Sequence, residues 1–296
     1  MNDSFILVAI ILSAFLAKTA YQRFFTRREL FDAFTNLLTN AVYYLLVPLA
    51  FIYTFSTRSL AESDVLIVAS FALYIAVAGL SFKYISRTWR DDVRNAALLT
   101  VLFPNAVFLG FPVSLALFGD VKIASILGLA TLTFNVLIPD FIALKKIDLL
   151  KILKLPALIG FLIGVFFNQL GHPGTYVSGL LWWAPKILSY LATFVLGLRL
   201  QLGGITSDMV KKPLLVTVLY RFIIAPVVAV CFALSVGFSW IESIQLAVVS
   251  GMPPAVLNTL MASKYGWRPD LVAYITFILT IPTVLALPLL GAIAFH

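Results

Sequence analysis

The sequence predicts an all-α polytopic membrane protein with ten transmembrane helices, arranged as a 5+5 inverted repeat. Three observations predict this fold: long apolar runs along the chain, basic residues confined to alternate connections, and two proline-broken segments at matching places in the two halves. Of the 296 residues, 61% are hydrophobic and 11% are charged, and the mean hydropathy is +1.03. Soluble proteins carry about 25% charged residues, so we expect lipid around most of this chain.

Ten apolar runs are long enough to cross a bilayer. A hydrocarbon core about 30 Å thick requires roughly 20 helical residues. The runs span residues 4–22, 34–56, 65–84, 95–118, 123–144, 155–171, 179–199, 213–235, 239–262 and 271–294. They divide the chain into a first repeat of five helices, residues 1–148, and a second repeat of five helices, residues 149–296.

The basic residues predict how the chain is oriented in the membrane. The odd-numbered connections between runs hold most of the Lys and Arg, whereas the even-numbered connections hold only Arg58 and Lys122. Cytoplasmic loops are enriched in Lys and Arg, so we expect a protein of the cell membrane with both termini outside. Because each repeat has an odd number of helices, the second repeat is inverted relative to the first.

The composition argues against several classes of function. The net charge of +8 is explained by loop topology, so we expect no nucleic acid partner. One cysteine, Cys231, and two histidines, His172 and His296, provide neither a zinc site nor a convincing nucleophile–base pair. We therefore expect no enzymatic activity, no cofactor and no metal.

The run 95–118 contains a helix break with a polar residue beside it. Pro104, Gly110 and Pro112 fall within nine positions, and proline removes backbone hydrogen bonds from a helix. In hydrocarbon the freed groups need partners or a cavity. Asn105 is therefore either a ligand for a substrate or coupling ion, or an interhelical hydrogen bond that locks the packing.

The run 239–262 has a similar break. Pro253 and Pro254 lie in the middle of the run, with Asn258 one turn further on, and the alternative interpretation is a simple kink. The segment 104–107, PNAV, lies 149 residues before the segment 253–256, PPAV, and half the chain is 148 residues. Paired interrupted helices indicate a transporter substrate site. Their half-helix N-termini have partial positive charge, which suits an anionic substrate.

Two charged residues within the runs have alternative interpretations. Arg221 lies well inside the run 213–235, where a charge is costly unless it is paired or wet. It either guides an anion, or snorkels to the interface or pairs with Asp140. Asp140 near the end of the run 123–144 either couples transport to protons, which requires a raised pKa, or is an interfacial acid neutralised by Lys145, Lys146 or Arg221.

Several of these motifs resemble the auxin efflux carrier family, which includes plant exporters and many prokaryotic homologues. The string Asn-x-x-x-Leu-Gly-x-Pro from Asn105 to Pro112 is similar to the family's helix-4 signature. The helix-9 segment Met252 to Ala255, followed by Ala262, Tyr265-Gly266 and Asp270, is similar to its second crossover, and Arg221 with Pro226 resembles its helix-8 pattern. Asn258 has no firm counterpart in the family pattern.

The resemblance implies a fold of the sodium/proton-antiporter type and export of small organic anions. It implies a scaffold of helices 1, 2, 6 and 7, a moving part of helices 3–5 and 8–10, and a homodimer. Carried over to this chain, Pro104, Asn105, Pro253 and Pro254 frame the crossing point. We therefore expect an elevator-type, alternating-access secondary transporter, with a sodium-coupled symporter resembling the bile-acid transporters as the alternative. A channel is a more distant alternative.

Overall fold

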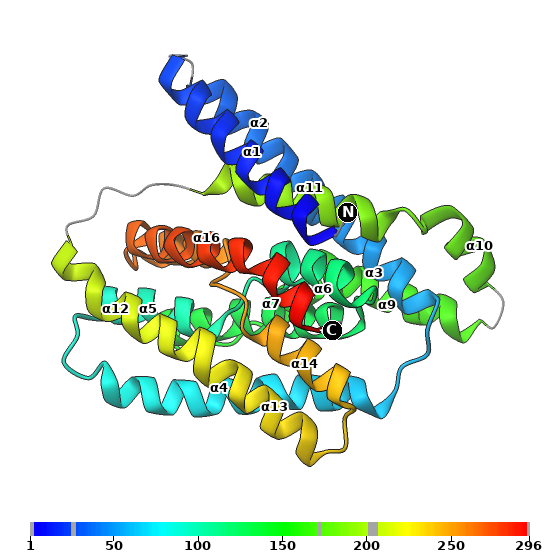
Figure 1. Ribbon diagram of the computed structural model, residues 1–296. Coiled ribbons are helices and arrows are strands. Elements are labelled where there is room, and N and C mark those ends of the chain that lie inside the picture. Colours follow the sequence, from blue (N-terminus) through cyan, green and yellow to red (C-terminus); the bar gives the residue numbers. More distant parts are fainter. Residues whose placement is uncertain (1–2, 25–27, 171–172, 201–206, 295–296) are drawn as a thin grey trace.

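The computed structural model shows an all-helical protein (Figure 1), and it describes residues 3–24, 28–170, 173–200 and 207–294. His172 and His296 lie outside these ranges. The described helices are α1 (Asp3–Phe24), α2 (Arg28–Ala41), η1 (Val42–Leu46), α3 (Val47–Ser56), α4 (Glu62–Ile85), α5 (Asp91–Leu102), η2 (Ala106–Gly110), α6 (Phe111–Phe118), α7 (Lys122–Leu144), α8 (Leu150–Leu153), α9 (Pro156–Gln169), α10 (Pro173–Leu181), α11 (Ala184–Arg199), α12 (Ser207–Leu219), η3 (Tyr220–Ile224), α13 (Ala225–Ser235), α14 (Trp240–Ser250), α15 (Leu257–Tyr265) and α16 (Pro269–Ala294).

Seven helical segments of the described chain have the length and apolar composition needed to cross a membrane. They are Ser4–Phe24, Glu29–Ser56, Glu62–Ile85, Lys122–Leu144, Tyr176–Arg199, Val210–Ser235 and Pro269–Leu287. The other three predicted runs contain shorter apolar helices, Ala106–Phe118, Pro156–Gln169 and Trp240–Ser250. Two of these three are short because the helix is interrupted, as the prolines predict.

Three helices contain a five-residue π-helical segment just before a proline. The segments η1, η2 and η3 each begin six residues before a proline, namely Pro48, Pro112 and Pro226. Proline has no N–H and its ring clashes with the carbonyl of the preceding turn, so the preceding turn widens to i→i+5 bonds. These helices therefore stay continuous through the proline.

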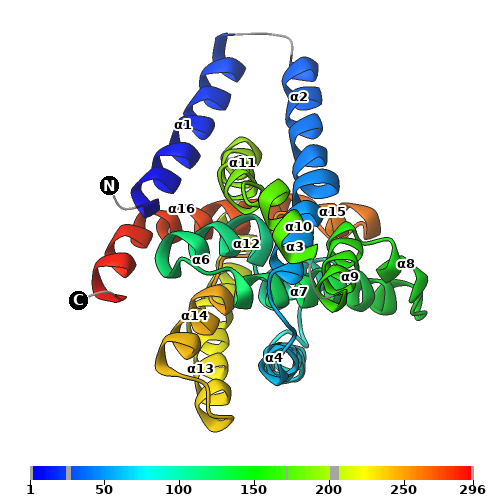
Figure 2. The same ribbon diagram turned by 90° about the vertical axis from the view of Figure 1, so that its right-hand side faces the viewer.

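Close backbone contacts fix the helices around α11 and α3. A Cβ atom on Gly160 of α9 would lie 2.5 Å from the carbonyl oxygen of Pro48 on α3, and one on Gly197 of α11 would lie 2.6 Å from that of Ile11 on α1. Glycine is needed at both points because the helix axes approach so closely. Figure 2 shows α1 and α2 rising away from the rest of the molecule on either side of α11.

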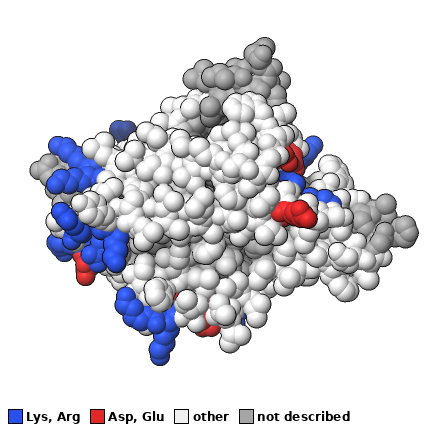
Figure 3. Space-filling model, turned by 90° about the horizontal axis from the view of Figure 1, so that it is seen from below, with Lys and Arg blue, Asp and Glu red and all other residues white. Residues whose placement is uncertain are grey.

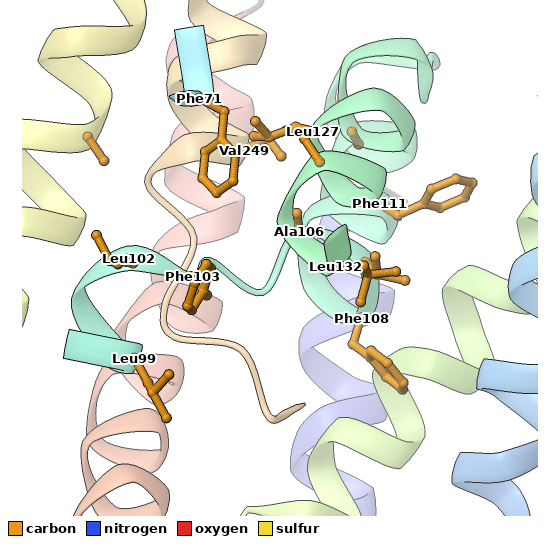
Figure 4. Close-up of a cluster of buried hydrophobic side chains, with 14 of the residues drawn as sticks. Phe71, Leu99, Leu102, Phe103, Ala106, Phe108, Phe111, Leu127, Leu132 and Val249 are labelled. Carbon is orange, nitrogen blue, oxygen red and sulfur yellow. The ribbon is translucent and has the colours of Figure 1, made fainter. Parts of the chain in front are cut away.

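The main hydrophobic core surrounds the break after α5. Figure 4 shows the chain leaving α5 at Leu102 and Phe103 as an extended segment and resuming as helix at Ala106. Phe103, Ala106 and Val249 are buried there. Figure 3 shows Lys and Arg gathered mainly at one end of the molecule, where the connection between α4 and α5 lies in Figure 1. Which side of the membrane this basic end faces stays a prediction.

Candidate functional site

The two helix breaks meet and pair with each other. Asn105 N donates to Pro253 O over 2.8 Å, and Ala255 N donates to Phe103 O over 3.0 Å, which forms an isolated antiparallel bridge between Pro104 and Pro254. The two prolines face each other at a position that needs no N–H donor, because the flanking residues make both bonds. The polar backbone freed by each break is thus satisfied by the other break, as hydrocarbon requires.

Asn258 fastens the second break to the end of α5. It is fully buried, and its Nδ2 donates to Leu99 O over 3.0 Å and to Phe103 O over 3.2 Å. Asn135 Nδ2 on α7 donates to Asn258 Oδ1 over 2.8 Å. One amide therefore joins α15, α5 and α7 at the crossing point.

Arg221 binds the C-terminal ends of both interrupted helices. It is fully buried in η3. Its Nη1 donates to Val101 O over 3.2 Å, its Nε donates to Met252 O over 3.1 Å and its Nη2 donates to Ser250 O. Helix C-termini have partial negative charge, so the guanidinium compensates two of them at once. The alternative in which Arg221 pairs with Asp140 is wrong, because its guanidinium donates to these carbonyls instead.

Tyr74 on α4 completes this arrangement. Its hydroxyl donates to Val101 O over 2.6 Å and accepts from Arg221 Nη1 over 3.2 Å. The guanidinium carbon lies 5.4 Å from the centre of the Tyr74 ring, within the range of a cation–π contact. A charge at this depth is tolerated because every side of it meets an acceptor or a ring.

Asn105, Gly110 and Pro112 shape the start of the second half-helix. Asn105 O accepts from Gly110 N over 2.8 Å, and Asn105 is the residue before η2. Asn105 is buried, and its Nδ2 has no hydrogen-bond partner among the described residues. Gly110 packs against Val249, 3.1 Å from a Cβ placed on it, and Pro112 lies in the first turn of α6.

Two of the cavities next to the crossing point share part of their lining. The first, of about 100 Å³, is lined by Thr39, Phe108, Val195, Leu196, Arg199, Leu200, Val256, Leu257, Thr259, Leu260, Ala273, Thr276 and Phe277. The second, of about 150 Å³, is lined by Thr39, Asn40, Tyr43, Tyr44, Phe108, Leu132, Asn135, Val136, Leu155, Leu257, Leu260 and Met261. Both are bounded by Thr39, Phe108, Leu257 and Leu260. Each is lined by residues of α2, η2 and α15, together with α11 and α16 in the first cavity and with η1 and α7 in the second.

Two of the residues that line these cavities carry a buried polar atom without a partner among the described residues. Thr276 lines the first cavity and Asn135 the second. Thr276 Oγ1 and Asn135 Oδ1 are buried and have no hydrogen-bond partner among the described residues. A buried polar atom without a partner is costly, and such atoms mark places where a ligand or water supplies the missing bond.

Asp140 lies away from both cavities, at the end of α7. Its carboxylate accepts from Lys264 Nζ over 3.1 Å and also from Lys151 Nζ and the Tyr265 hydroxyl, and its side chain is 2% exposed. It therefore connects α7 with α8 and with the end of α15. The carboxylate raises the pKa of Lys151, since the bond favours the ammonium form. The neutralising cations are Lys151 and Lys264, instead of the expected Lys145, Lys146 and Arg221.

The structure brings most of the predicted site residues together at the crossing point. Pro104, Asn105, Gly110, Pro253, Pro254 and Asn258 surround it and Arg221 caps it, whereas Pro112 follows in α6 and Asp140 lies apart. The residues that line the cavities instead lie about one helical turn after each break, such as Phe108 and Leu257. Sequence reasoning also missed Arg199, whose place at the end of an apolar run made it look like a topology signal.

Comparisons with known proteins find similarity to membrane transporters. A family described as membrane transport protein matches residues 138–291, just over half of the chain. An uncharacterized transporter of Methanocaldococcus jannaschii is 23% identical over 284 residues, which cover 88% of this chain and 90% of the relative. An uncharacterized transporter of Methanothermobacter thermautotrophicus is 25% identical over 210 residues, which cover 69% of this chain and 67% of the relative.

Proposed function

Because the chain belongs to the membrane transport protein family, the auxin-efflux-carrier-like family that its motifs resemble, we propose that it is a secondary transporter for a small organic anion. It moves this anion by alternating access around the crossing point of the two broken helices. Export is the expected direction. The observation that carries the proposal is the pair of cavities between two groups of helices, next to the paired breaks.

The two groups match the division into a scaffold and a moving part. The scaffold contains α1–α3 and α9–α11, and the moving part contains α4–α7 and α12–α16, which together make ten membrane crossings in a 5+5 inverted repeat. Close packing supports a rigid scaffold, since α9 contacts α3, and α11 contacts α1, through glycine at backbone distance. The basic end faces the cytoplasm in this proposal, with both termini outside the cell membrane.

The positions of the helix ends support an anionic substrate. Leu257 begins α15 and Phe108 lies in the first turn after the α5 break, and both border the two cavities. Helix N-termini attract negative charge. The C-terminal ends of α5 and α14 are already occupied by Arg221, so the N-terminal ends remain for the substrate.

Each site residue has a proposed role. Pro104, Pro253 and Pro254 hold the two breaks apart from regular helix, and Gly110 and Pro112 shape the turn after the first break. Asn105 supplies an amide donor, Nδ2, that no described residue uses. Asn258 and Arg221 position the half-helices. Asp140 couples their motion to the segment between the repeats through its ion pairs.

Transport in proteoliposomes tests the proposal. Purified protein is reconstituted and the uptake of radiolabelled carboxylates is measured with and without sodium, at two pH values. We expect wild-type flux to persist without sodium, and Asn105→Ala and Pro254→Ala to lose most of it while keeping the far-UV circular dichroism of the wild type. Full flux in both folded variants contradicts the crossover site. Strict dependence on sodium favours the alternative symporter.

A further inference from the structure

Arg199 occupies a distinctive position at the end of α11. It lines the first cavity, and no other described residue in the lining of the two cavities is charged. Its Nε and Nη2 donate to Thr39 Oγ1 over 3.1 Å and 2.9 Å, and its Nη2 donates to Asn36 Oδ1 over 2.7 Å. Two neutral side chains of α2 therefore hold the guanidinium in place.

The guanidinium keeps donors available. Nη1 forms no hydrogen bond with the described residues, and no described carboxylate forms an ion pair with Arg199. Asp32 on α2 acts on Arg199 electrostatically, but among the described residues it makes no salt bridge with it. The neighbouring cation, Lys18, is bound to Leu200 O over 2.7 Å. An arginine held by neutral groups keeps its full positive charge, and the two N–H groups of Nη1 remain to donate to a carboxylate.

The rest of the cavity fits an anion with an apolar body. Thr276 is one of the lining residues, and its buried hydroxyl has no hydrogen-bond partner among the described residues. Leu257 brings the N-terminus of α15 to the wall. The remaining lining is mostly apolar, with Phe108 and Leu196 among its side chains. A dry apolar cavity of about 150 Å³ holds a benzene-sized group, so cavities of about 100 and 150 Å³ suit a small body of this kind.

Simpler roles for Arg199 explain less. A cation at a helix C-terminus interacts favourably with the helix dipole, and basic residues collect at cytoplasmic ends of helices. Neither role requires two side chains of a different helix to hold the guanidinium, nor a position on the wall of a cavity. Because Arg199 lies on the scaffold and α15 lies on the moving part, the two sides of the cavity together supply the positive potential.

We infer that Arg199, held by Thr39 and Asn36, is the scaffold's anion-binding residue and selects a single carboxylate group over neutral molecules of the same shape. This inference rests on the proposed function and deepens it. The substrate anion binds the guanidinium with its apolar body toward Phe108. Release follows when the moving part carries the α15 N-terminus away from Arg199.

Paired probes test the inference. The thermal midpoint of the purified protein is measured with acetate, butyrate and benzoate, each beside its neutral amide, and KM is measured in proteoliposomes for any carboxylate that is transported. We expect at least one carboxylate to stabilise the wild type more than its amide does. In Arg199→Gln the apparent Kd and KM for that carboxylate rise about ten- to hundredfold, the range for a lost hydrogen bond to a charged group.

Matched variants keep the result interpretable. Arg87→Gln removes an arginine that packs over Tyr84, outside both cavities, and is expected to behave as wild type. Thr39→Val keeps the charge of Arg199 and the shape of residue 39 but removes the acceptor that orients the guanidinium. KM should therefore rise with kcat less affected. This variant tests the inference even if Arg199→Gln fails to fold. A folded Arg199→Gln or Thr39→Val variant with wild-type KM overturns the inference, as does a wild type that binds each amide as well as its carboxylate. Absence of flux for every anion in the wild type contradicts the proposed function instead.

Discussion

Replacing Asn258 with leucine tests how the crossing point is held together. Leucine has a similar volume, so the change removes polar groups without opening a large cavity. Two hydrogen bonds to Leu99 O and Phe103 O are lost, each worth about 0.5–1.5 kcal/mol. Both carbonyls keep a backbone donor, from Phe103 N and Ala255 N, so neither becomes unsatisfied.

A second effect of similar size falls on Asn135. Its Nδ2 loses the partner that it has in Asn258 Oδ1, and a buried donor without a partner costs about 1–3 kcal/mol. Asn258→Leu should therefore destabilise the protein by about 2–6 kcal/mol. Unfolding by SDS in mixed micelles, followed by circular dichroism, measures this difference. Asn40→Leu, at an exposed amide outside the network, is the control and should change stability by no more than about 0.5 kcal/mol.

A double-mutant cycle refutes or supports the reasoning. Asn135→Leu alone removes the donor to Asn258 Oδ1 and leaves that oxygen unpaired. In the double variant both amides are gone, so no unpaired amide group remains from this pair. The double variant should therefore be less destabilised than the sum of the single variants by about 1–3 kcal/mol. Additive effects mean that the two amides do not interact as the structure shows.

Three further predictions concern other contacts. Arg221→Lys cannot reach all the acceptors of the guanidinium, so it should lower the thermal midpoint and the flux together, and an unchanged midpoint refutes the capping role. Gly160→Leu would place a side chain inside the backbone of Pro48, so overpacking of about 1–3 kcal/mol or more is expected in SDS unfolding; wild-type stability contradicts the close contact. The bond to Asp140 raises the pKa of Lys151 above its ordinary value of 10.5. The extra stability over Lys151→Met should therefore be complete below pH 10.5 and disappear as pH rises through the higher folded-state pKa, and a difference that persists through that titration contradicts it.

Much of the fold follows from local properties of the sequence. The apolar runs place the helices because lipid requires each to satisfy its own backbone bonds, and Pro104 and Pro254 mark the breaks because proline interrupts those bonds. The π-helical segments were not expected, since a proline inside an apolar run equally permits a simple kink. Helix lengths at the breaks also differ from the runs, because hydropathy continues through residues 103–105 and 251–256 where the helix does not.

The site was less accessible to sequence reasoning. Asn105 and Asn258 stand out as amides in apolar runs, but their partners are backbone carbonyls and a distant Asn135, which only the folded chain brings together. Arg221 is charged at depth, yet its partners lie on three other segments. Arg199 has no local signal at all, because its importance comes from a cavity formed by helices far apart in sequence.

Motion between the two helix groups is the central claim, and a reversible cross-link measures it. In a Cys231→Ala background, cysteines replace Asn40 on α2 and Leu260 on α15, which both line the second cavity and belong to different helix groups. Ser56 on α3 and Asn168 on α9, joined by a 3.1 Å hydrogen bond, provide the control pair. After treatment with a short reducible bifunctional reagent, carboxylate flux in proteoliposomes should stop for the first pair, continue for the control pair and return on reduction. Unchanged flux in the fully cross-linked Asn40–Leu260 variant contradicts alternating access between these groups.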